Sequence, residues 1–200
     1  MKKTRLAVFV SGGGTNLQAI IDARIPSVDI VLVFSNNPGA YALERASNEG
    51  IPCEVLDHKK YASRDEYDSE ALELIEPYDI DLIALAGFMR ILSPRFVRAY
   101  QNRILNIHPA LLPSFPGVNA ARQALEAGVK HTGVTVHFVD EGVDTGPIIL
   151  QSVVPVLDDD TEESLLERIH SEEHRIYPAA IELVASGKFR IEGKRVIALE

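Results

Sequence analysis

The 200-residue sequence lacks the features that mark secreted and membrane-spanning proteins. Its single cysteine, Cys53, has no partner for an internal disulfide, so a reducing cytoplasmic compartment is expected. No apolar run approaches the roughly 18 residues of a membrane span. The apolar start Leu6–Val10 is soon ended by glycines and is too short for a signal-peptide core of roughly 7–15 residues. We therefore expect a cytoplasmic protein with no membrane partner.

Positive charge is also scarce. The chain has 20 Lys and Arg residues against 29 Asp and Glu residues, which gives a formal net charge of −9. Such a chain has no overall positive field to attract nucleic acid. We therefore expect small-molecule partners and no nucleic acid, with any anion bound by a local group of residues; the sequence predicts no oligomeric state. The 46% hydrophobic and 24% charged residues that are present are typical of one globular domain.

Short apolar segments alternate with segments of helical spacing along the chain. The near-continuous apolar run Ile80–Ala86 suits a strand that is covered on both faces, as in a parallel sheet. The alternation predicts a single-domain α/β fold, a mostly parallel twisted sheet with helices on both faces. The expected strands are Arg5–Val10, Ile30–Phe34, Cys53–Leu56, Ile80–Ala86, Ile104–His108, Val134–Val139 and Ile148–Pro155.

Helix ends are marked by capping signals. Ser63 followed by Glu66 is a capping box, in which the hydroxyl accepts an amide hydrogen and the carboxylate reaches back. Ser93 before Pro94 offers a second helix N-terminus. Further expected elements are a helical run Leu17–Ile21, a helix Asn119–Leu125 closed by Gly128 as a left-handed cap, a long helix from about Leu165 to Gly187, and a C-terminal hairpin of Phe189–Glu192 with Arg195–Leu199.

A glycine-rich segment, Ser11–Asn16, follows the first expected strand and precedes a helical run. Glycines let the backbone approach a ligand closely, and the free N–H groups of a helix N-terminus attract anions. No Gly-Lys-Ser/Thr follows, and the third glycine of the dinucleotide fingerprint is missing. Two interpretations remain: a site for a single phosphate, with Thr15 and Asn16 as donors, or a tight structural turn without a ligand.

The segment Ile104–Pro109 predicts a pair of polar side chains at a strand end. Residues i and i+2 of a strand share a face, so Asn106 and His108 project together, and Pro109 ends the strand. Open α/β sheets bind ligands at the carboxyl ends of their strands. An amide donor beside a protonated imidazole suits an oxyanion that forms on an attacked carbonyl. The alternative is a hydrogen-bonded pair with only a structural role.

A carboxylate follows later in the chain, in the loop 140–147. Asp144 lies between glycines and ahead of another strand, so it is able to turn inward and favour the protonated form of His108. A solvated loop charge is the alternative. His137 shares a strand face with Thr135 and is either a ligand contact or a satisfied core histidine.

Two histidines, His170 and His174, lie four residues apart on the long expected helix. No glutamate directly follows His170, so the zinc-protease motif is absent. A solvated helix face is the preferred interpretation, and we expect no metal.

Taken together, four segments resemble the folate-dependent formyltransferases, and the resemblance runs in order from Leu6 to about Gly187. The glycine loop and the Met-Arg-Ile-Leu segment are similar to the members of that family that formylate glycinamide ribonucleotide. The four segments are Ser11–Gln18, Ala86–Pro94, Asn106–Pro113 and Asp144–Ile148.

This resemblance implies a Rossmann-like formyltransferase fold and a reaction. The formyl group of 10-formyltetrahydrofolate, the co-substrate, would pass to the amino group of 5'-phosphoribosylglycinamide in de novo purine (IMP) biosynthesis. No metal is implied. The matching positions are Asn106, His108 and Asp144 for catalysis, Gly14, Thr15, Asn16 and Glu173 for the phosphate and ribonucleotide, and Arg64, Met89, Arg90, Ile91, Leu92 and Asn106 for the folate.

The same resemblance suggests a division of the single domain and three rival functions. We expect a phosphate-binding half over about 1–100, a folate-binding and catalytic half over about 101–187, and a hairpin over about 188–200. A formyltetrahydrofolate hydrolase shares the Asn-His-Asp core but usually carries an N-terminal regulatory domain. A methionyl-tRNA formyltransferase needs an RNA-binding domain and a basic face. A non-catalytic phosphate-binding module would leave the three polar residues unexplained.

Overall fold

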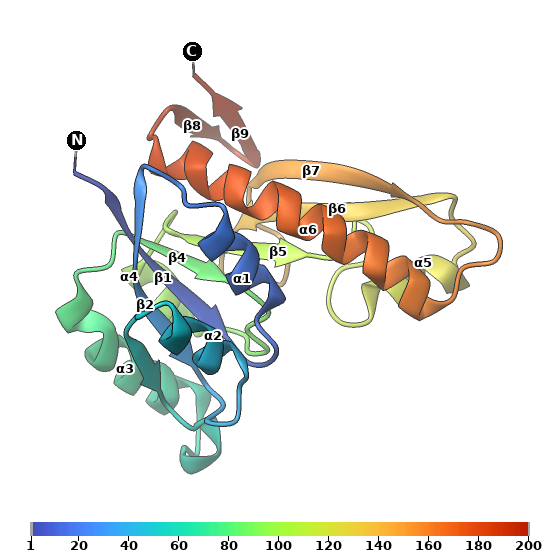
Figure 1. Ribbon diagram of the computed structural model, residues 1–200. Helices are drawn as coiled ribbons and strands as arrows, with labels where there is room; N and C mark the ends of the chain where they lie inside the picture. The colour runs from blue at the N-terminus through green and yellow to red at the C-terminus, as the bar shows by residue number, and fades with distance from the viewer. Residues whose placement is uncertain (1, 200) are drawn as a thin grey trace.

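The computed structural model describes residues 2–199, which build one nine-stranded sheet in the order β3-β2-β1-β4-β5-β6-β7-β9-β8 (Figure 1). The strands are β1 (Thr4–Val10), β2 (Val28–Ser35), β3 (Cys53–Val55), β4 (Leu82–Leu85), β5 (Ile104–His108), β6 (His131–Phe138), β7 (Ile148–Pro155), β8 (Phe189–Glu192) and β9 (Arg195–Ala198).

The sheet has a parallel and a mainly antiparallel part. Strands β3, β2, β1, β4 and β5 run parallel, as the sequence predicted. Strand β6 is antiparallel to both β5 and β7, and β8 and β9 form the predicted hairpin. The connection 139–147 between β6 and β7 is too short for a parallel crossover, which needs roughly a dozen or more residues, so these two strands pair antiparallel.

Helices cover both faces of the sheet. Residue Val8 of β1 packs into one core together with α1, α2, α5 and α6, and its neighbour Phe9 packs into the other with α3 and α4. Figure 1 shows α1 and α6 side by side across the first face. The helices are α1 (Thr15–Asp22), α2 (Ala42–Asn48), α3 (Arg64–Ile75), α4 (Pro94–Ala99), α5 (Ala120–Glu126) and α6 (Glu162–Ala185), with two short 3₁₀ turns at His58–Lys60 and Glu76–Tyr78.

Most of the predicted element boundaries are confirmed to within a few residues. Ser63 caps α3 by accepting the Glu66 N–H at 3.1 Å. The second half of the expected capping box is wrong by one residue, because the Glu66 carboxylate accepts from the N–H of Ala62 instead of Ser63. Gly128 has the predicted left-handed φ of 66°. Helix α2 was not predicted, since its N-cap Tyr41 makes no side-chain capping bond.

The parallel strands place three loops at one edge of the sheet. Strands β1, β4 and β5 are adjacent and parallel, so the segments that follow them, 11–14, 86–93 and 109–119, leave from the same edge. The glycine-rich loop, the predicted folate segment and the chain that follows His108 therefore lie at one edge of the sheet. Within residues 2–199, none of the helices combines the length and low polarity that a membrane crossing requires.

Candidate active site

Three predicted residues meet at the carboxyl end of β5. Asn106 and His108 project from the same face of β5, and the loop after β6 brings Asp144 to them. The Nδ1 atom of His108 lies 3.4 Å from Oδ2 of Asp144, and the two side chains are only 5% and 12% exposed. A carboxylate and an imidazole this close and this well shielded interact more strongly than an exposed pair would.

The second ring nitrogen of His108 is held by the backbone. Its Nε2 lies 2.8 Å from the carbonyl oxygen of Phe115 in the loop after β5. Because a carbonyl oxygen only accepts, Nε2 carries a proton and donates it to Phe115. This bond fixes the plane of the ring and leaves Nδ1 as the nitrogen that faces Asp144.

Asp144 is turned inward by its own loop. Its φ of 54° is left-handed, and its Oδ2 accepts the N–H of Gly117 at 2.8 Å. Gly146 follows, where a Cβ would lie 1.8 Å from the carbonyl oxygen of Phe138, so the chain can pass β6 only with glycine at this position. The neighbouring Asp140 instead accepts from Gly142 and Thr145 within the loop.

The pKa of Asp144 is lowered from its ordinary value. Burial favours the neutral carboxyl and opposes this shift, but three groups together outweigh burial: the His137 imidazole, the Gly117 N–H and the charge of His108. Asp144 is therefore a carboxylate at neutral pH.

A fourth polar residue, His137, completes the cluster. Strands β5 and β6 pair so that Asn106 lies opposite His137 and His108 opposite Thr135. The Nδ1 of His137 lies 2.8 Å from the carbonyl oxygen of Phe138, and its Nε2 lies 3.2 Å from Nδ2 of Asn106 and 3.7 Å from Asp144. Since Nδ1 donates to the carbonyl, Nε2 accepts one amide proton of Asn106. His137 is thus both a buried core histidine and a member of the site.

The role of Thr135 was not predicted from the sequence: it holds the loop that follows β5, directly after His108. Its buried hydroxyl donates to the carbonyl oxygen of Ala110 at 2.7 Å and accepts the N–H of Leu112 at 3.0 Å. Gln151 of β7 donates to the carbonyl oxygen of Leu112 at 2.9 Å. The i, i+2 spacing of Thr135 and His137 could have indicated that both belong to the site, because such a pair on β6 lies opposite Asn106 and His108 when β5 and β6 are antiparallel.

The glycine-rich loop has a geometry that needs glycine at one position. Gly14 has a φ of 73°, and a Cβ there would lie 2.6 Å from the Cβ of Ala42. Helix α2 holds the loop from outside, because the N–H of Ala42 donates to the carbonyl oxygen of Gly12 at 3.0 Å and Nε of Arg45 donates to that of Gly13 at 2.8 Å. The loop therefore lets a ligand approach the backbone at the start of α1 closely.

Replacing Gly14 by alanine is expected to destabilise the fold by about 1–3 kcal/mol, because the left-handed backbone and the contact with Ala42 both oppose a side chain. Chemical denaturation measures the change. The matched control is Gly12→Ala, since a Cβ at Gly12 meets no atom within 4 Å. Equal unfolding free energies for the two variants would contradict the packing argument.

A cleft of about 570 Å³ lies between the glycine loop and α6. Asn16 and Glu173 meet in it: Nδ2 of Asn16 donates to Oε2 of Glu173 at 3.0 Å, and the two residues are 9% and 5% exposed. Burial raises the pKa of Glu173, although Asn16 and His170 oppose the shift. The Oδ1 atom of Asn16 is buried without a partner among the described residues. The cleft thus offers an acceptor and a carboxylate beside the loop.

The predicted folate segment follows β4 and lies next to the glycine loop, which follows the neighbouring strand β1. Met89 is 79% exposed and lines the cleft, Ile91 is also exposed, and Leu92 is buried. The guanidinium of Arg90 lies 4.2 Å from the ring centre of Tyr67 on α3, and the Asp68 carboxylate accepts the N–H of Ser93. Arg64 is exposed at the first position of α3.

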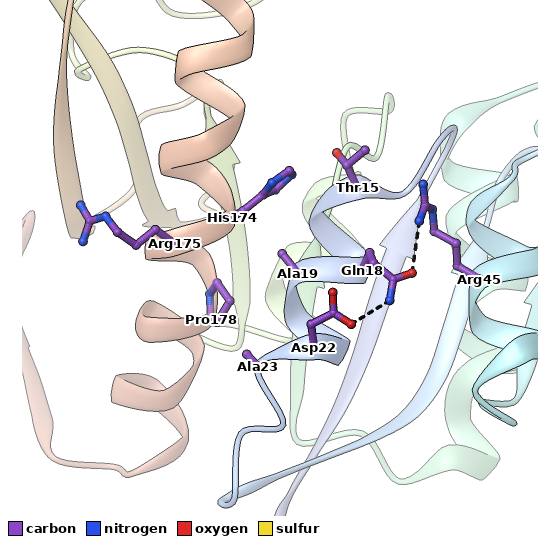
Figure 2. A pocket seen from close by; sticks show the side chains of 9 residues that line it. All are labelled: Thr15, Gln18, Ala19, Asp22, Ala23, Arg45, His174, Arg175 and Pro178. Atoms are coloured by element: carbon purple, nitrogen blue, oxygen red, sulfur yellow. Dashed lines mark hydrogen bonds between the residues drawn. The ribbon is translucent and has the colours of Figure 1, made fainter.

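A second hollow, of about 560 Å³, lies between α1 and α6 behind the glycine loop (Figure 2). Gln18 is bonded there to both Asp22 and Arg45, while Arg175 points away from α1. Thr15 lines both hollows. His174 also faces this hollow, and burial, followed by the charge of His170, lowers its pKa. In the described part of the chain, no three His, Cys, Asp or Glu side chains are grouped to hold a metal ion.

Comparison with known proteins identifies what the chain resembles. The profile of the family described as formyl transferase matches residues 4–181. The phosphoribosylglycinamide formyltransferase of Escherichia coli (strain K12) is 46% identical over 190 residues, which cover 93% of this chain and 89% of that protein. The crystal structure of glycinamide ribonucleotide transformylase 1 from Symbiobacterium toebii is 51% identical, has a TM-score of 0.96, and covers 99% of this chain and 95% of its own.

A longer relative contains the same region. The trifunctional purine biosynthetic protein adenosine-3 of Drosophila melanogaster is 52% identical over 191 residues. These residues are 93% of this chain and 14% of the fly protein. The chain therefore spans only a small part of that relative.

Proposed function

The chain belongs to the formyl transferase family, and we propose that it transfers the formyl group of 10-formyltetrahydrofolate to the amino group of 5'-phosphoribosylglycinamide in de novo purine biosynthesis. One observation carries this proposal: Asn106, His108 and Asp144 lie together at the carboxyl end of β5, and Ile107 and Pro109 at the same strand end line the cleft beside the glycine loop. The relatives named for this reaction supply the substrate class.

Oxyanion stabilisation is the proposed task of Asn106 and His108. When the neutral amine attacks the formyl carbon, negative charge develops on the formyl oxygen. One amide proton of Asn106 is bonded to His137, so the second remains for that oxygen. Protonated His108, oriented by the Phe115 carbonyl, would share its Nδ1–H between Asp144 at 3.4 Å and the formyl oxygen. His137 acts as a positioning residue, since it sets the plane of the Asn106 amide.

Asp144 is the proposed route for the proton. Its carboxylate stabilises the imidazolium of His108, which lies 3.4 Å away. The attacking amine must lose a proton as the C–N bond forms, and the departing folate nitrogen must gain one. A carboxylate beside the reacting carbon can accept the first and help deliver the second, directly or through water. Holding both substrates in one cleft removes much of the entropic barrier.

The glycine loop and α6 are the proposed ribonucleotide site. Backbone N–H groups at the start of α1, with Gly14 and Thr15, would bind the phosphate. The unpartnered Oδ1 of Asn16 would accept a hydrogen bond from one substrate hydroxyl, and the Glu173 carboxylate would accept one from another. We propose that the folate lies against Arg64, Met89, Arg90, Ile91, Leu92 and Asn106.

Replacing Glu173 by glutamine is expected to weaken ribonucleotide binding while it stabilises the fold. The pKa of Glu173 is raised by burial, so its contribution to folding is favourable below the ordinary pKa and is lost as the pH rises through the folded-state value. At pH 7 a neutral isostere that still accepts from Asn16 avoids this loss. We expect a KM for the ribonucleotide raised roughly tenfold, as for a lost hydrogen bond to a charged group, and an unfolding midpoint equal to or above that of the wild type. A lower midpoint with unchanged KM would contradict the assignment.

The test of the proposed function follows release of the formyl group from 10-formyltetrahydrofolate. Release that requires 5'-phosphoribosylglycinamide supports transfer. Release without an acceptor supports a hydrolase, and no release supports a non-catalytic binding module. The buffer should contain no nucleic acid, so that a tRNA acceptor can be added in a separate reaction.

The proposal includes a location and a division of the chain. A cytoplasmic enzyme fits the single exposed thiol, Cys53, because reducing compartments keep such thiols free. We propose a phosphate-binding half over about 1–100, a folate-binding and catalytic half over about 101–187, and a terminal hairpin over about 188–200.

A further inference from the structure

The side chain of Ser11 joins two segments of the proposed substrate cleft. Its Oγ lies 2.6 Å from Oδ1 of Asn36 and 2.8 Å from the backbone nitrogen of Met89. Ser11 opens the glycine loop, and Met89 opens the segment that we assign to the folate. Both residues line the same cleft. The hydroxyl is thus a direct link between the proposed sites of the two substrates.

The directions of these two hydrogen bonds are fixed by chemistry. An amide oxygen only accepts, so the single hydroxyl proton of Ser11 goes to Asn36. The hydroxyl lone pair then receives the N–H of Met89. Asn36 is 3% exposed and directly follows β2, and its neighbour Asn37 donates to the carbonyl oxygen of Ser11 at 3.1 Å. Strand β2 therefore holds Ser11, and Ser11 holds Met89.

Building on the proposed function, we propose that the Ser11 hydroxyl is a positioning group that couples binding of the two substrates. A phosphate bound to the glycine loop restricts the backbone at Ser11, and through the Oγ to Met89 N–H bond it restricts the start of the folate segment. A folate bound against Met89 restricts the glycine loop in turn, because coupling between two sites is reciprocal. The substrate that binds first therefore orders this shared link, and the second substrate binds to a link that is already ordered.

A non-reacting pair of ligands tests this coupling. Tetrahydrofolate, the deformylated product, and glycinamide ribonucleotide cannot react with each other, so calorimetry can give the Kd of each with and without the other. For the wild type, each ligand is expected to lower the Kd of the other. For Ser11→Ala, both single-ligand Kd values are expected to rise roughly 3- to 10-fold, as for one lost hydrogen bond, and the mutual effect is expected to disappear.

Two further variants separate positioning from general destabilisation. Ser27→Ala removes a buried hydroxyl that has no hydrogen-bond partner among the described residues, so it should leave all Kd values unchanged. Ser11→Thr keeps the hydroxyl and should recover most of the coupling. Unfolding midpoints for the variants show whether a change in Kd reflects loss of the fold.

Three results would overturn the proposal: an absence of coupling in the wild type, wild-type coupling in Ser11→Ala, or equal losses in Ser11→Ala and Ser27→Ala. Failure of the proposed function is a different result. It would appear as a wild-type protein that binds both ligands and does not transfer the formyl group.

Discussion

Replacing His108 by alanine should lower kcat for formyl transfer roughly 10²- to 10³-fold, the usual loss when one oxyanion donor is removed. The imidazole is 5% exposed, is held by the Phe115 carbonyl and faces Asp144, so its removal takes away a donor that the surrounding chain holds in a fixed orientation. KM for the ribonucleotide should change little, because the proposed phosphate site is the glycine loop after β1, whereas His108 is in β5. Steady-state kinetics with both substrates varied measures the two effects.

Asn106→Ala is the companion variant, with a loss of similar size expected. The two residues act on one oxygen, so the double variant should lose less than the product of the single losses. His137→Ala serves as the control for positioning, since its Nε2 orients the Asn106 amide at 3.2 Å and lies 3.7 Å from Asp144, and we assign it no contact with the reacting atoms. We expect a smaller loss of kcat for His137→Ala than for Asn106→Ala. Wild-type turnover in His108→Ala or Asn106→Ala would remove both residues from catalysis.

Asp144→Asn should lower kcat roughly 10²- to 10⁴-fold, the range of a positioned general acid–base group. The amide keeps an oxygen for the Gly117 N–H, so the loop should stay in place while the negative charge is lost. Affinity for the ribonucleotide should be nearly unchanged, which equilibrium binding can measure separately from turnover. A raised ribonucleotide Kd with unchanged kcat would make Asp144 a binding residue instead.

The pH dependence of stability offers a control on the same variant. The pKa of Asp144 is lowered, so its favourable contribution to folding is present above the ordinary value and is lost as the pH falls through the folded-state value. The difference in unfolding free energy between wild type and Asp144→Asn should therefore be constant above about pH 5 and shrink below about pH 4. Loss of activity between pH 5 and 7 would then come from another group.

Strand periodicity explains why the positions of the proposed catalytic residues Asn106 and His108 could be predicted. The i, i+2 rule placed Asn106 and His108 on one face, and Pro109 placed them at the end of β5. The glycine loop was predicted because its composition suits only a close turn. The parallel strands followed from continuous apolar runs such as the one in β4.

Other contacts depend on strand register and loop paths, which the sequence does not display locally. His137 lies opposite Asn106 only because β6 is antiparallel to β5 in one particular register. The bond from Ser11 to Met89 joins residues 78 positions apart, and that from Asn16 to Glu173 joins residues 157 apart. No local pattern could have paired them. For the folate segment, the resemblance supplied residues whose roles geometry alone does not define.

The net charge of −9 acquires a more specific meaning in the structure. Both proposed substrates are anionic, and an acidic protein must bind them through local groups. Arg45 is already bonded to the carbonyl oxygen of Gly13, and Arg90 stacks on Tyr67. Backbone N–H groups of the glycine loop are therefore the proposed phosphate donors, and arginine side chains support the loops around them.

The most direct test of the account uses 10-formyltetrahydrofolate labelled with ¹³C in the formyl group and glycinamide ribonucleotide labelled with ¹⁵N in its amino group. Nuclear magnetic resonance then reports where the carbon goes. We predict a ¹³C formyl signal coupled to ¹⁵N, formed by the wild type and nearly absent with Asp144→Asn. Appearance of free [¹³C]formate without the coupled signal would contradict amine attack and show that water is the acceptor.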